Sequence, residues 1–426
     1  MNKLQYLIKK TLWSFKNYGF KKTLHIVKNW LTVPSMRKEN RLNPKMRYDN
    51  VDFLLKKIDF RKNYLYGDRK SRLSPDSIHL SWILSPFHIG SGGHQTIFRF
   101  IKFLSERGYK NVLYITDGHN FSSEKEAAQM IYEQFFPIQD LDVRFLKEEE
   151  LVNGRAVIDD TDFVIATRYN TAYYAALINN CIKRFYFVQD LEPIFFPMGY
   201  NYILAENTYR LGMHAICASP WLAQQMKKYN LETDNFYLGY DPEVYFNRNL
   251  AREKGTVVFY ARYQSERRAV ELGMLALEIA AQKVPDMKAI LYGANDNLSG
   301  YDFPFENKGV IKYDEMADIF ANAEIGLSFS LTNYGLTPTE MMASGLPVIE
   351  LKGENTENVF THVENVLLAD PNPNAVADAI VRLLSDEALR AKLSSGGLAF
   401  VEDKSWNSIW AGLEPMWQRE ILSLGR

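Results

Sequence analysis

Short apolar runs alternate with stretches of helical spacing over most of the chain. Between about residues 77 and 240 the apolar runs are rich in β-branched and aromatic residues, and the stretches 124–135 and 171–179 have amphipathic helical spacing. This alternation predicts buried parallel strands with helices on both faces of the sheet. The strands predicted in this first series are residues 78–85, 112–116, 143–146, 163–167, 185–188 and 214–218.

A second series of apolar runs starts near residue 257. Its predicted strands are residues 257–260, 288–292, 310–312, 325–329 and 347–351. The polar, irregular stretch 241–254 is predicted to link the two series. Two doubly wound α/β domains therefore follow one another, and the expected binding site is a cleft between them. We predict domains over residues 73–245 and 246–400, with a C-terminal helix at 401–426 that packs back toward the first domain.

The first 72 residues differ from the rest in charge. They hold 19 Lys and Arg against 5 Asp and Glu, although the 426-residue chain has a formal net charge of −1. Within residues 1–60, apolar positions such as Leu4, Leu7 and Ile8 recur at three- and four-residue steps with lysines between them. This pattern predicts a basic amphipathic helical extension that lies on an anionic membrane surface. The alternative is an apolar stripe packed on the body, and no module for nucleic acid is expected.

Composition is that of a globular protein, with 46% hydrophobic and 24% charged residues. The two cysteines, Cys181 and Cys217, lie in apolar runs and form neither a disulfide framework nor a zinc pattern, which favours a reducing compartment. Lysines interrupt the N-terminal apolar stretches, so no secretory signal is expected, and no apolar run is long enough to predict a transmembrane helix. The expected location is cytoplasmic or peripheral on the inner face of the membrane.

Residues 328–350 contain the clearest candidate for ligand chemistry. A strand is predicted to end at Ser330, a loop carries Gly335, and a helix begins near Pro338. The free N–H groups at such a helix start suit a diphosphate, and Glu340 in the first turn could reach ribose hydroxyls. Thr337 and Glu340 also have the spacing of a capping box, with Pro338 at the first helical position, and local spacing alone favours that interpretation.

The same stretch resembles the donor-binding signature of the retaining GT-B glycosyltransferases of family 4. That signature has an acidic residue, seven residues, a second Glu, small residues and Gly-x-Pro-Val. Glu340 falls on the second acidic position and residues 345–348 on the tail, whereas Thr332 replaces the first acid. The resemblance implies a GT-B fold, a nucleotide-sugar donor, retention of configuration and a contact between Thr332 and the donor sugar.

Other segments match the same family in order. Residues 90–94 resemble its glycine-rich loop, residues 237–246 resemble its linker with Leu238 in place of an Asn, and Ala261 and Arg262 resemble its Gly-Arg pair that holds the diphosphate. Residues 314–322 are expected to form a helix beside the base. The resemblance assigns donor binding to Gly92, Gly93, Arg262, Arg267, Arg268, Tyr292, Gly293, Lys312, Thr332, Tyr334, Gly335, Leu336, Thr337 and Glu340.

Acceptor contacts and catalysis are expected from His94, Arg168 and Asp190, since the last two are polar residues at strand ends. Residues 187–200 resemble a narrower group, the bacterial rhamnosyltransferases that build surface-layer or cell-wall glycans from dTDP-rhamnose. The expected donor is dTDP-rhamnose and the expected acceptor an oligosaccharide or lipid-linked glycan. A UDP- or GDP-sugar enzyme and a catalytically silent carbohydrate- or membrane-binding protein are the alternatives.

No metal or other cofactor is expected. Asp160 and Asp162 have a D-x-D spelling, but they begin a buried strand, and His88, His94 and His214 lack ligand spacing. The family resemblance implies that arginines and helix dipoles neutralise the charge that a metal neutralises in other enzymes.

Overall fold

A computed structural model describes residues 51–74, 76–116, 120–147, 151, 157–295, 298 and 300–423. The described residues from Leu54 onward cluster as one compact unit. Most of the basic extension predicted over residues 1–60 lies outside the described residues. None of the described helices is both long enough and apolar enough to cross a membrane.

The first half contains a seven-stranded parallel sheet in the order β3-β2-β1-β4-β5-β6-β7. All six strands predicted here are confirmed. The additional strand, β7, has a polar sequence that pairs along one edge only, so hydrophobic patterning gave no sign of it. The strands are β1 (His79–Leu84), β2 (Lys110–Ile115), β3 (Asp142–Phe145), β4 (Phe163–Ala166), β5 (Lys183–Val188), β6 (His214–Cys217) and β7 (Thr233–Asn235).

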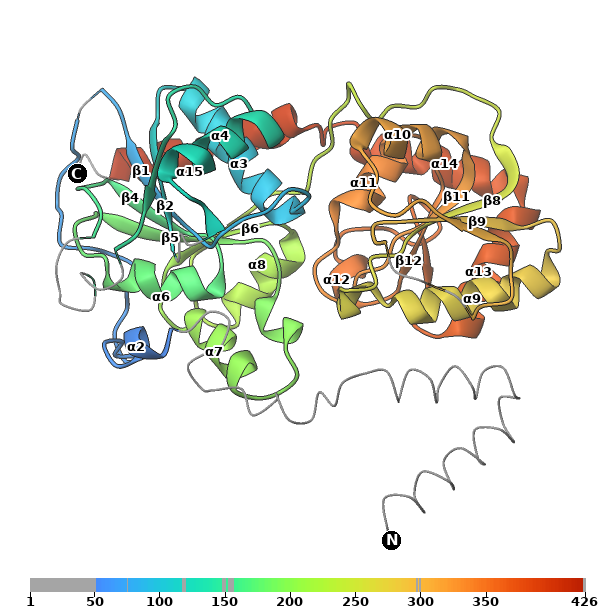
Figure 1. The fold of residues 1–426 in the computed structure, drawn as a ribbon, viewed down its shortest axis with the longest axis horizontal. Helices are drawn as coiled ribbons and strands as arrows, with labels where there is room; N and C mark the ends of the chain where they lie inside the picture. The colour runs from blue at the N-terminus through green and yellow to red at the C-terminus, as the bar shows by residue number, and fades with distance from the viewer. Residues whose placement is uncertain are drawn as a thin grey trace, which may run out of the picture. The chain divides into compact units, whose positions relative to one another are not determined.

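Helices connect these parallel strands (Figure 1). Ser219 caps the last of them by accepting a hydrogen bond from the N–H of Leu222, as its Ser-Pro sequence predicts. The elements are α2 (Asp52–Leu55), α3 (Gly92–Glu106), α4 (Glu124–Gln134), α6 (Tyr169–Leu177), η3 (Glu192–Phe195), α7 (Tyr200–Thr208) and α8 (Pro220–Lys227).

The second half contains a six-stranded parallel sheet in the order β10-β9-β8-β11-β12-β13 (Figure 1). The strand predicted at residues 310–312 is wrong. β10 lies at Phe305–Asn307, and Val310 is 68% exposed after a turn in which Gly309 has a φ of +67°. The strands are β8 (Glu253–Tyr260), β9 (Lys288–Tyr292), β10 (Phe305–Asn307), β11 (Ala323–Leu327), β12 (Val348–Leu351) and β13 (Leu367–Ala369).

Both faces of this sheet are covered by helices, and a continuous apolar core lies beneath them. Close packing depends on Gly273, because a Cβ there would lie 2.3 Å from the ring of Phe259. The elements are η4 (Glu266–Arg268), α9 (Val270–Lys283), α10 (Tyr313–Asn322), α11 (Leu336–Ala343), α12 (Glu354–Glu357), α13 (Pro373–Ser385), α14 (Glu387–Val401) and α15 (Trp406–Ser423).

Helix α15 packs on the first sheet although it follows the second in sequence. The ring centroids of Trp410 and Phe100 are 4.0 Å apart, and those of Trp417 and Phe185 are 5.4 Å apart. The ammonium group of Lys183 on β5 lies 2.7 Å from the carboxylate of Glu420 on α15. The chain therefore crosses between the halves twice. The predicted domain boundaries at residues 72, 245 and 400 stay predictions.

Replacing Trp417, which is 1% exposed, with alanine should leave a large cavity between α15 and the first sheet. We expect Trp417→Ala to lower the free energy of unfolding by about 3–5 kcal/mol, measured by chemical denaturation. Leu422→Ala on the same helix is the control, because Leu422 is 73% exposed and should change stability little. Equal effects of the two substitutions would contradict the packing described.

Candidate functional site

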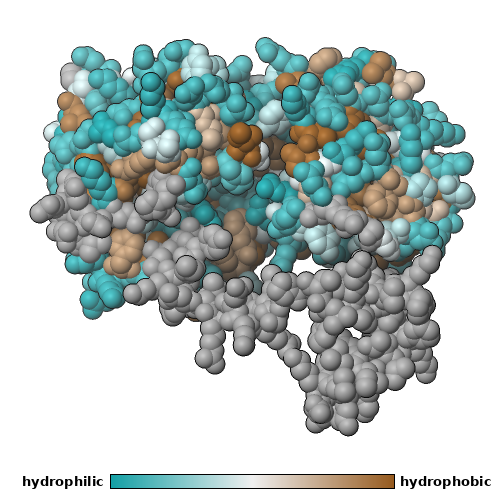
Figure 2. Space-filling model, in the orientation of Figure 1, coloured by the Kyte–Doolittle hydropathy of each residue, from teal (hydrophilic) through white to brown (hydrophobic). Residues whose placement is uncertain are grey.

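A cleft of about 1340 Å³ lies at the carboxyl ends of strands from both sheets. In each sheet the strand order reverses direction beside the central strand, β1 or β8, and ligands of doubly wound folds bind at such switch points. Figure 2 shows hydrophobic and hydrophilic residues intermixed on the face drawn there. The cleft walls combine glycine-rich loops, arginines and buried acids, which is the composition of a polar-ligand site.

Three predicted arginines line the wall formed by the second half. Arg262 follows β8, and Arg267 and Arg268 lie on the single turn η4. The guanidinium of Arg268 donates to the carbonyl of Phe329 over 3.2 Å and lies 3.0 Å from the position that a Cβ on Gly335 would occupy. Gly335 therefore lets Arg268 lie against the start of α11.

Arg267 reaches toward the first half. Its Nε atom lies 3.7 Å from a carboxylate oxygen of Asp190, and its guanidinium lies 4.4 Å from the ring centroid of Phe195. Burial lowers the pKa of Arg267, although the guanidinium stays charged in the physiological range. The two halves thus supply opposite sides of one charged region.

The start of α11 contradicts the predicted capping box. The helix begins at Leu336 with Gly335 as its N-cap, so Thr337 and Pro338 are already its second and third residues. Gly335 has no side chain to cap the helix and enters it from an extended conformation, with φ −95° and ψ 179°. The first N–H groups of α11 therefore lack a side-chain cap beside the arginines, which is the arrangement that binds anions.

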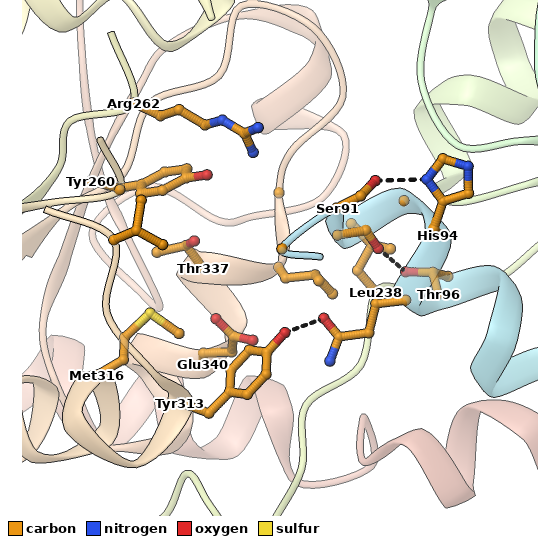
Figure 3. Close-up of a pocket in the computed structure, with 18 of the residues that line it drawn as sticks. Ser91, His94, Thr96, Leu238, Tyr260, Arg262, Tyr313, Met316, Thr337 and Glu340 are labelled. Carbon is orange, nitrogen blue, oxygen red and sulfur yellow. Dashed lines mark hydrogen bonds between the residues drawn. The ribbon is translucent and has the colours of Figure 1, made fainter. Parts of the chain in front are cut away.

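Glu340 lies one turn further along α11, in the same wall (Figure 3). It is 8% exposed, and burial raises the pKa of its carboxyl to about 8; Asp241 raises this pKa further and Arg99 lowers it. Tyr313, the first residue of α10, donates a hydrogen bond to the amide oxygen of Gln95 on α3 (Figure 3). The wall formed by the second half is thereby joined to the glycine-rich side of the cleft.

The remaining predicted donor residues are also found in the cleft wall, with one exception. Gly293 turns the chain after β9 with a φ of +107°, and a Cβ there would lie 2.6 Å from the Tyr260 ring. Thr332 is 2% exposed and is not among the described residues that line the cleft. The lining includes the predicted donor residues Gly92, Gly93, Tyr292, Gly293, Lys312, Tyr334, Leu336 and Thr337.

His94 and Arg168 face the cleft from the first half. The hydroxyl of Ser91 lies 2.8 Å from Nδ1 of His94 (Figure 3), and burial lowers the pKa of this imidazole to about 4. His88 and Arg168 lower this pKa further, because like charges disfavour protonation. His94 is therefore neutral near pH 7, and its ring can exchange hydrogen bonds with a neutral hydroxyl.

Glu192 is a cleft residue absent from the predicted site. It is 5% exposed on η3, where it accepts hydrogen bonds from the N–H of Tyr169 (2.8 Å) and the hydroxyl of Tyr186 (3.2 Å). Burial raises the pKa of its carboxyl to about 7, and Arg168 opposes this shift. The sequence signal that could have identified Glu192 is its position, two residues after Asp190 in a polar segment that follows a buried strand.

Asp190 lines the cleft and also joins the two halves. One carboxylate oxygen accepts from the N–H of Asn333 over 2.8 Å, and the other accepts from the hydroxyl of Thr332 over 3.1 Å. The side-chain amide of Asn333 donates to the carbonyls of Gln189 (3.1 Å) and Ala218 (2.9 Å). We call these five residues the junction.

Neither Asp160 nor Asp162 faces the cleft lining. Asp162 is fully buried and accepts from the N–H groups of Leu73 and His79, both over 2.9 Å. Asp160 accepts from Arg69 over 2.5 Å. Through these bonds, Asp160 and Asp162 hold the segment before β4 in place. Among the described residues, no group of three His, Cys, Asp or Glu is placed to hold a metal ion.

The raised pKa of Glu340 predicts a pH-dependent stability difference. Because folding raises this pKa from 4.5 to about 8, the buried carboxylate destabilises the protein increasingly as pH rises through that range. Glu340→Gln should therefore gain stability relative to the parent between pH 5 and about pH 8, on the order of 1.4 kcal/mol per unit of pKa shift. Unfolding measured across this range checks it. Glu357→Gln, at an exposed site, is the control, and parallel curves for all three proteins would contradict the burial of the Glu340 charge.

Residues 255–381 match a family model described as the C-terminal domain of WsaF. The chain is 30% identical over 336 residues to the O-antigen biosynthesis protein RfbC of Myxococcus xanthus; the match covers 77% of this chain and 26% of RfbC. The chain thus spans about a quarter of the length of that relative.

Two solved structures are similar over most of the chain. Sucrose-phosphate synthase from Thermosynechococcus elongatus has a TM-score of 0.63 and 14% identity, over 81% of this chain and all of that chain. Anabaena HepE in complex with UDP-glucose has a TM-score of 0.61 and 14% identity, over 80% of this chain and all of that chain. Together with the two parallel sheets, these similarities confirm the predicted architecture: the chain has the GT-B fold.

Proposed function

We propose that this protein is a glycosyltransferase that moves a sugar from a nucleoside diphosphate donor to a glycan acceptor in bacterial surface-polysaccharide synthesis. One observation carries the proposal. Arg262, Arg268 and the uncapped start of α11 face the same cavity, so cationic groups and free N–H groups converge where a diphosphate would fit. The similarity to an O-antigen biosynthesis protein supports the class of product.

For the donor we propose dTDP-rhamnose, with UDP- and GDP-sugars as the alternatives. The rhamnose assignment rests on the likeness of residues 187–200 to rhamnosyltransferases. HepE, which has the same fold, is described in complex with UDP-glucose. That complex supports a nucleotide-sugar donor for this protein and leaves a uridine diphosphate sugar as an alternative. Glu340 would hold the ribose hydroxyls, because its carboxyl lies one helical turn from the proposed diphosphate position.

In the proposed reaction the bond between the anomeric carbon and the diphosphate oxygen breaks, and the acceptor oxygen bonds to the same face of the sugar. The acceptor's proton passes to the departing diphosphate. Retention and this route follow from the resemblance to family 4. Arg262, Arg268 and the α11 dipole would stabilise the charge that grows on the leaving group, and no metal is required for this step.

The acceptor would bind against the wall made by the first half. His94 is neutral at pH 7, so it can accept or donate a hydrogen bond to a sugar hydroxyl without carrying charge. Arg168 and Glu192 line the same cleft, and Arg168 lowers the pKa of both His94 and Glu192, which makes Arg168 and Glu192 further candidates for acceptor contact. An oligosaccharide or lipid-linked glycan fits these polar groups.

A catalytically silent carbohydrate-binding protein is the second candidate. The observation that favours it is Thr332, which replaces an acid of the family signature and is buried at the junction. A silent protein of this kind would have no affinity for a nucleotide, whereas a transferase must bind one.

Thermal stabilisation by dTDP, UDP, GDP and ADP separates the two candidates. A nucleotide at 100 times its dissociation constant should add about 2.7 kcal/mol to the stability of the parent protein. Arg262→Ala should abolish most of this shift, since it removes a proposed diphosphate contact. Arg419→Ala, on the far helix α15 with a side chain that is 57% exposed, is the matched control and should keep the shift.

Selective stabilisation by dTDP would support the rhamnose donor and justify turnover assays with dTDP-rhamnose. Stronger stabilisation by a nucleotide with another base would support the same site but indicate a different donor. If no nucleotide stabilises the parent, or if both arginine variants keep the full shift, the proposed donor site is wrong.

A further inference from the structure

An exposed apolar ridge begins at the edge of the cleft in the first half. Five of the eighteen large hydrophobic side chains that are exposed in the described chain lie within residues 194–203. Their exposed fractions run from 36% for Phe195 to 80% for Met198, with 51% for Ile203. We call Ile194, Phe195, Met198, Tyr200 and Ile203 the ridge. Soluble proteins rarely leave such a cluster exposed without a partner for it.

The ridge is continuous with the proposed active site. Phe195 lines the cleft and lies under the guanidinium of Arg267, while Ile203 lies in α7, which follows η3 directly. A hydrophobic partner bound along the ridge would therefore end at the cleft wall that carries Arg168 and Glu192.

A basic segment is fixed beside α7. The N–H of Tyr64 donates to the carbonyl of Leu211, just after α7, over 2.7 Å. The ring of Phe60 meets that of Tyr173 at 6.3 Å, and the Tyr173 hydroxyl donates to the carbonyl of Leu204 on α7 over 2.7 Å. These contacts hold residues 56–62 next to the helix that carries the outer part of the ridge.

This segment is strongly cationic. Lys56, Lys57, Arg61 and Lys62 are exposed, and the Arg61 side chain remains 91% exposed while it bonds to Asp59. Asp59 is the one acid in the segment. On α7 itself, Glu206 bonds to Arg210 and to the hydroxyl of Tyr229, so its charge is already partnered.

Exposed apolar and aromatic side chains beside several cations form the chemistry that recognises an anionic bilayer. The hydrophobic groups enter the interface, and the cations are attracted to the lipid headgroups. An acidic protein would be attracted by the cations, but four of the five ridge side chains are apolar and Tyr200 alone carries a polar group. We propose that the ridge and residues 56–62 form one membrane-docking face, which holds the cleft at the surface of an anionic lipid bilayer.

The face gives a lipid-linked acceptor a short route into the cleft, and this consequence rests on the proposed function. Bilayer binding itself does not depend on the proposed function, because neither the basic segment nor any ridge residue other than Phe195 lines the cleft. The two proposals can therefore fail separately.

Flotation of the full chain with vesicles of phosphatidylcholine, with and without phosphatidylglycerol, tests the docking face. We expect binding only to the anionic vesicles, weakened by added salt because the cations are exposed. Met198→Asp with Ile203→Asp should lower the partition coefficient at least about tenfold. Lys56→Gln with Lys57→Gln should lower it about tenfold or more and reduce its salt dependence.

Leu275→Asp and Lys392→Gln are matched controls on exposed positions of α9 and α14, and both should bind as the parent does. The proposal is overturned if the parent does not bind anionic vesicles or if the ridge variant binds them as well as the parent does. It is also overturned if the controls lose as much binding as the ridge and lysine variants. Nucleotide stabilisation is measured on the same variants. A retained shift with lost vesicle binding separates the docking face from the donor site, whereas loss of both would show that the variants are damaged and would contradict the face as described.

Discussion

The junction between the two halves determines where the walls of the cleft meet. Asp190 follows β5 of the first sheet, and Thr332 and Asn333 follow β11 of the second, so the contact joins the carboxyl ends of both sheets. Asn333 is 2% exposed and its amide satisfies two carbonyls of the first half. Because a buried polar group without a partner is costly, any displacement of one half along the other leaves several groups unsatisfied. The arginines and the start of α11 are thereby held opposite His94, Arg168 and Glu192.

Burial also sets the charge of the cleft wall formed by the second half. Burial raises the pKa of the Glu340 and Glu350 carboxyls to about 8, so both are largely protonated at neutral pH. Glu350 is fully buried behind the wall, accepts from the N–H groups of Leu351 and Ser330, and has its pKa lowered in part by Arg268. These two buried acids therefore do little to neutralise the arginines, whereas the carboxylate of Asp190 lies 3.7 Å from Arg267. A cationic wall beside a helix N-terminus is stabilised by an incoming diphosphate, which supplies the missing negative charge.

Hydrophobic patterning was sufficient to predict the fold class, because parallel strands that are buried on both faces have continuous apolar sequences. Ten of the thirteen strands in the described part of the chain were predicted this way, whereas polar β7 and the short β10 and β13 were not recognised from their residues. Val310 shows the limit, because an apolar run can line a cleft instead of entering a sheet. The capping-box error has a different origin. Local spacing identified Thr337 as a cap, but the extended backbone of Gly335 starts the helix earlier and leaves its N–H groups without a side-chain cap.

Site residues were predictable where a motif marked them and not where the fold brought them together. Arg262, Gly335 and Glu340 lie in sequence patterns that resemble a known signature, and all three line the cleft. Glu192 and Tyr313 belong to the site because they contact residues on other elements of the fold. Thr332 does not line the cleft, because its hydroxyl donates a hydrogen bond to Asp190 of the other half. The pairs Tyr313–Gln95 and Thr332–Asp190 join residues more than 100 positions apart, which no local pattern specifies.

The most direct test of this account is a crystal structure of the full chain with dTDP or UDP bound. The account predicts diphosphate oxygens within hydrogen-bonding distance of the Arg262 guanidinium and of the N–H groups of Leu336 and Thr337, with the ribose beside Glu340. A nucleotide bound elsewhere, with this helix start and these arginines making no contact to it, would contradict the central claim that the second half of the cleft is a diphosphate site.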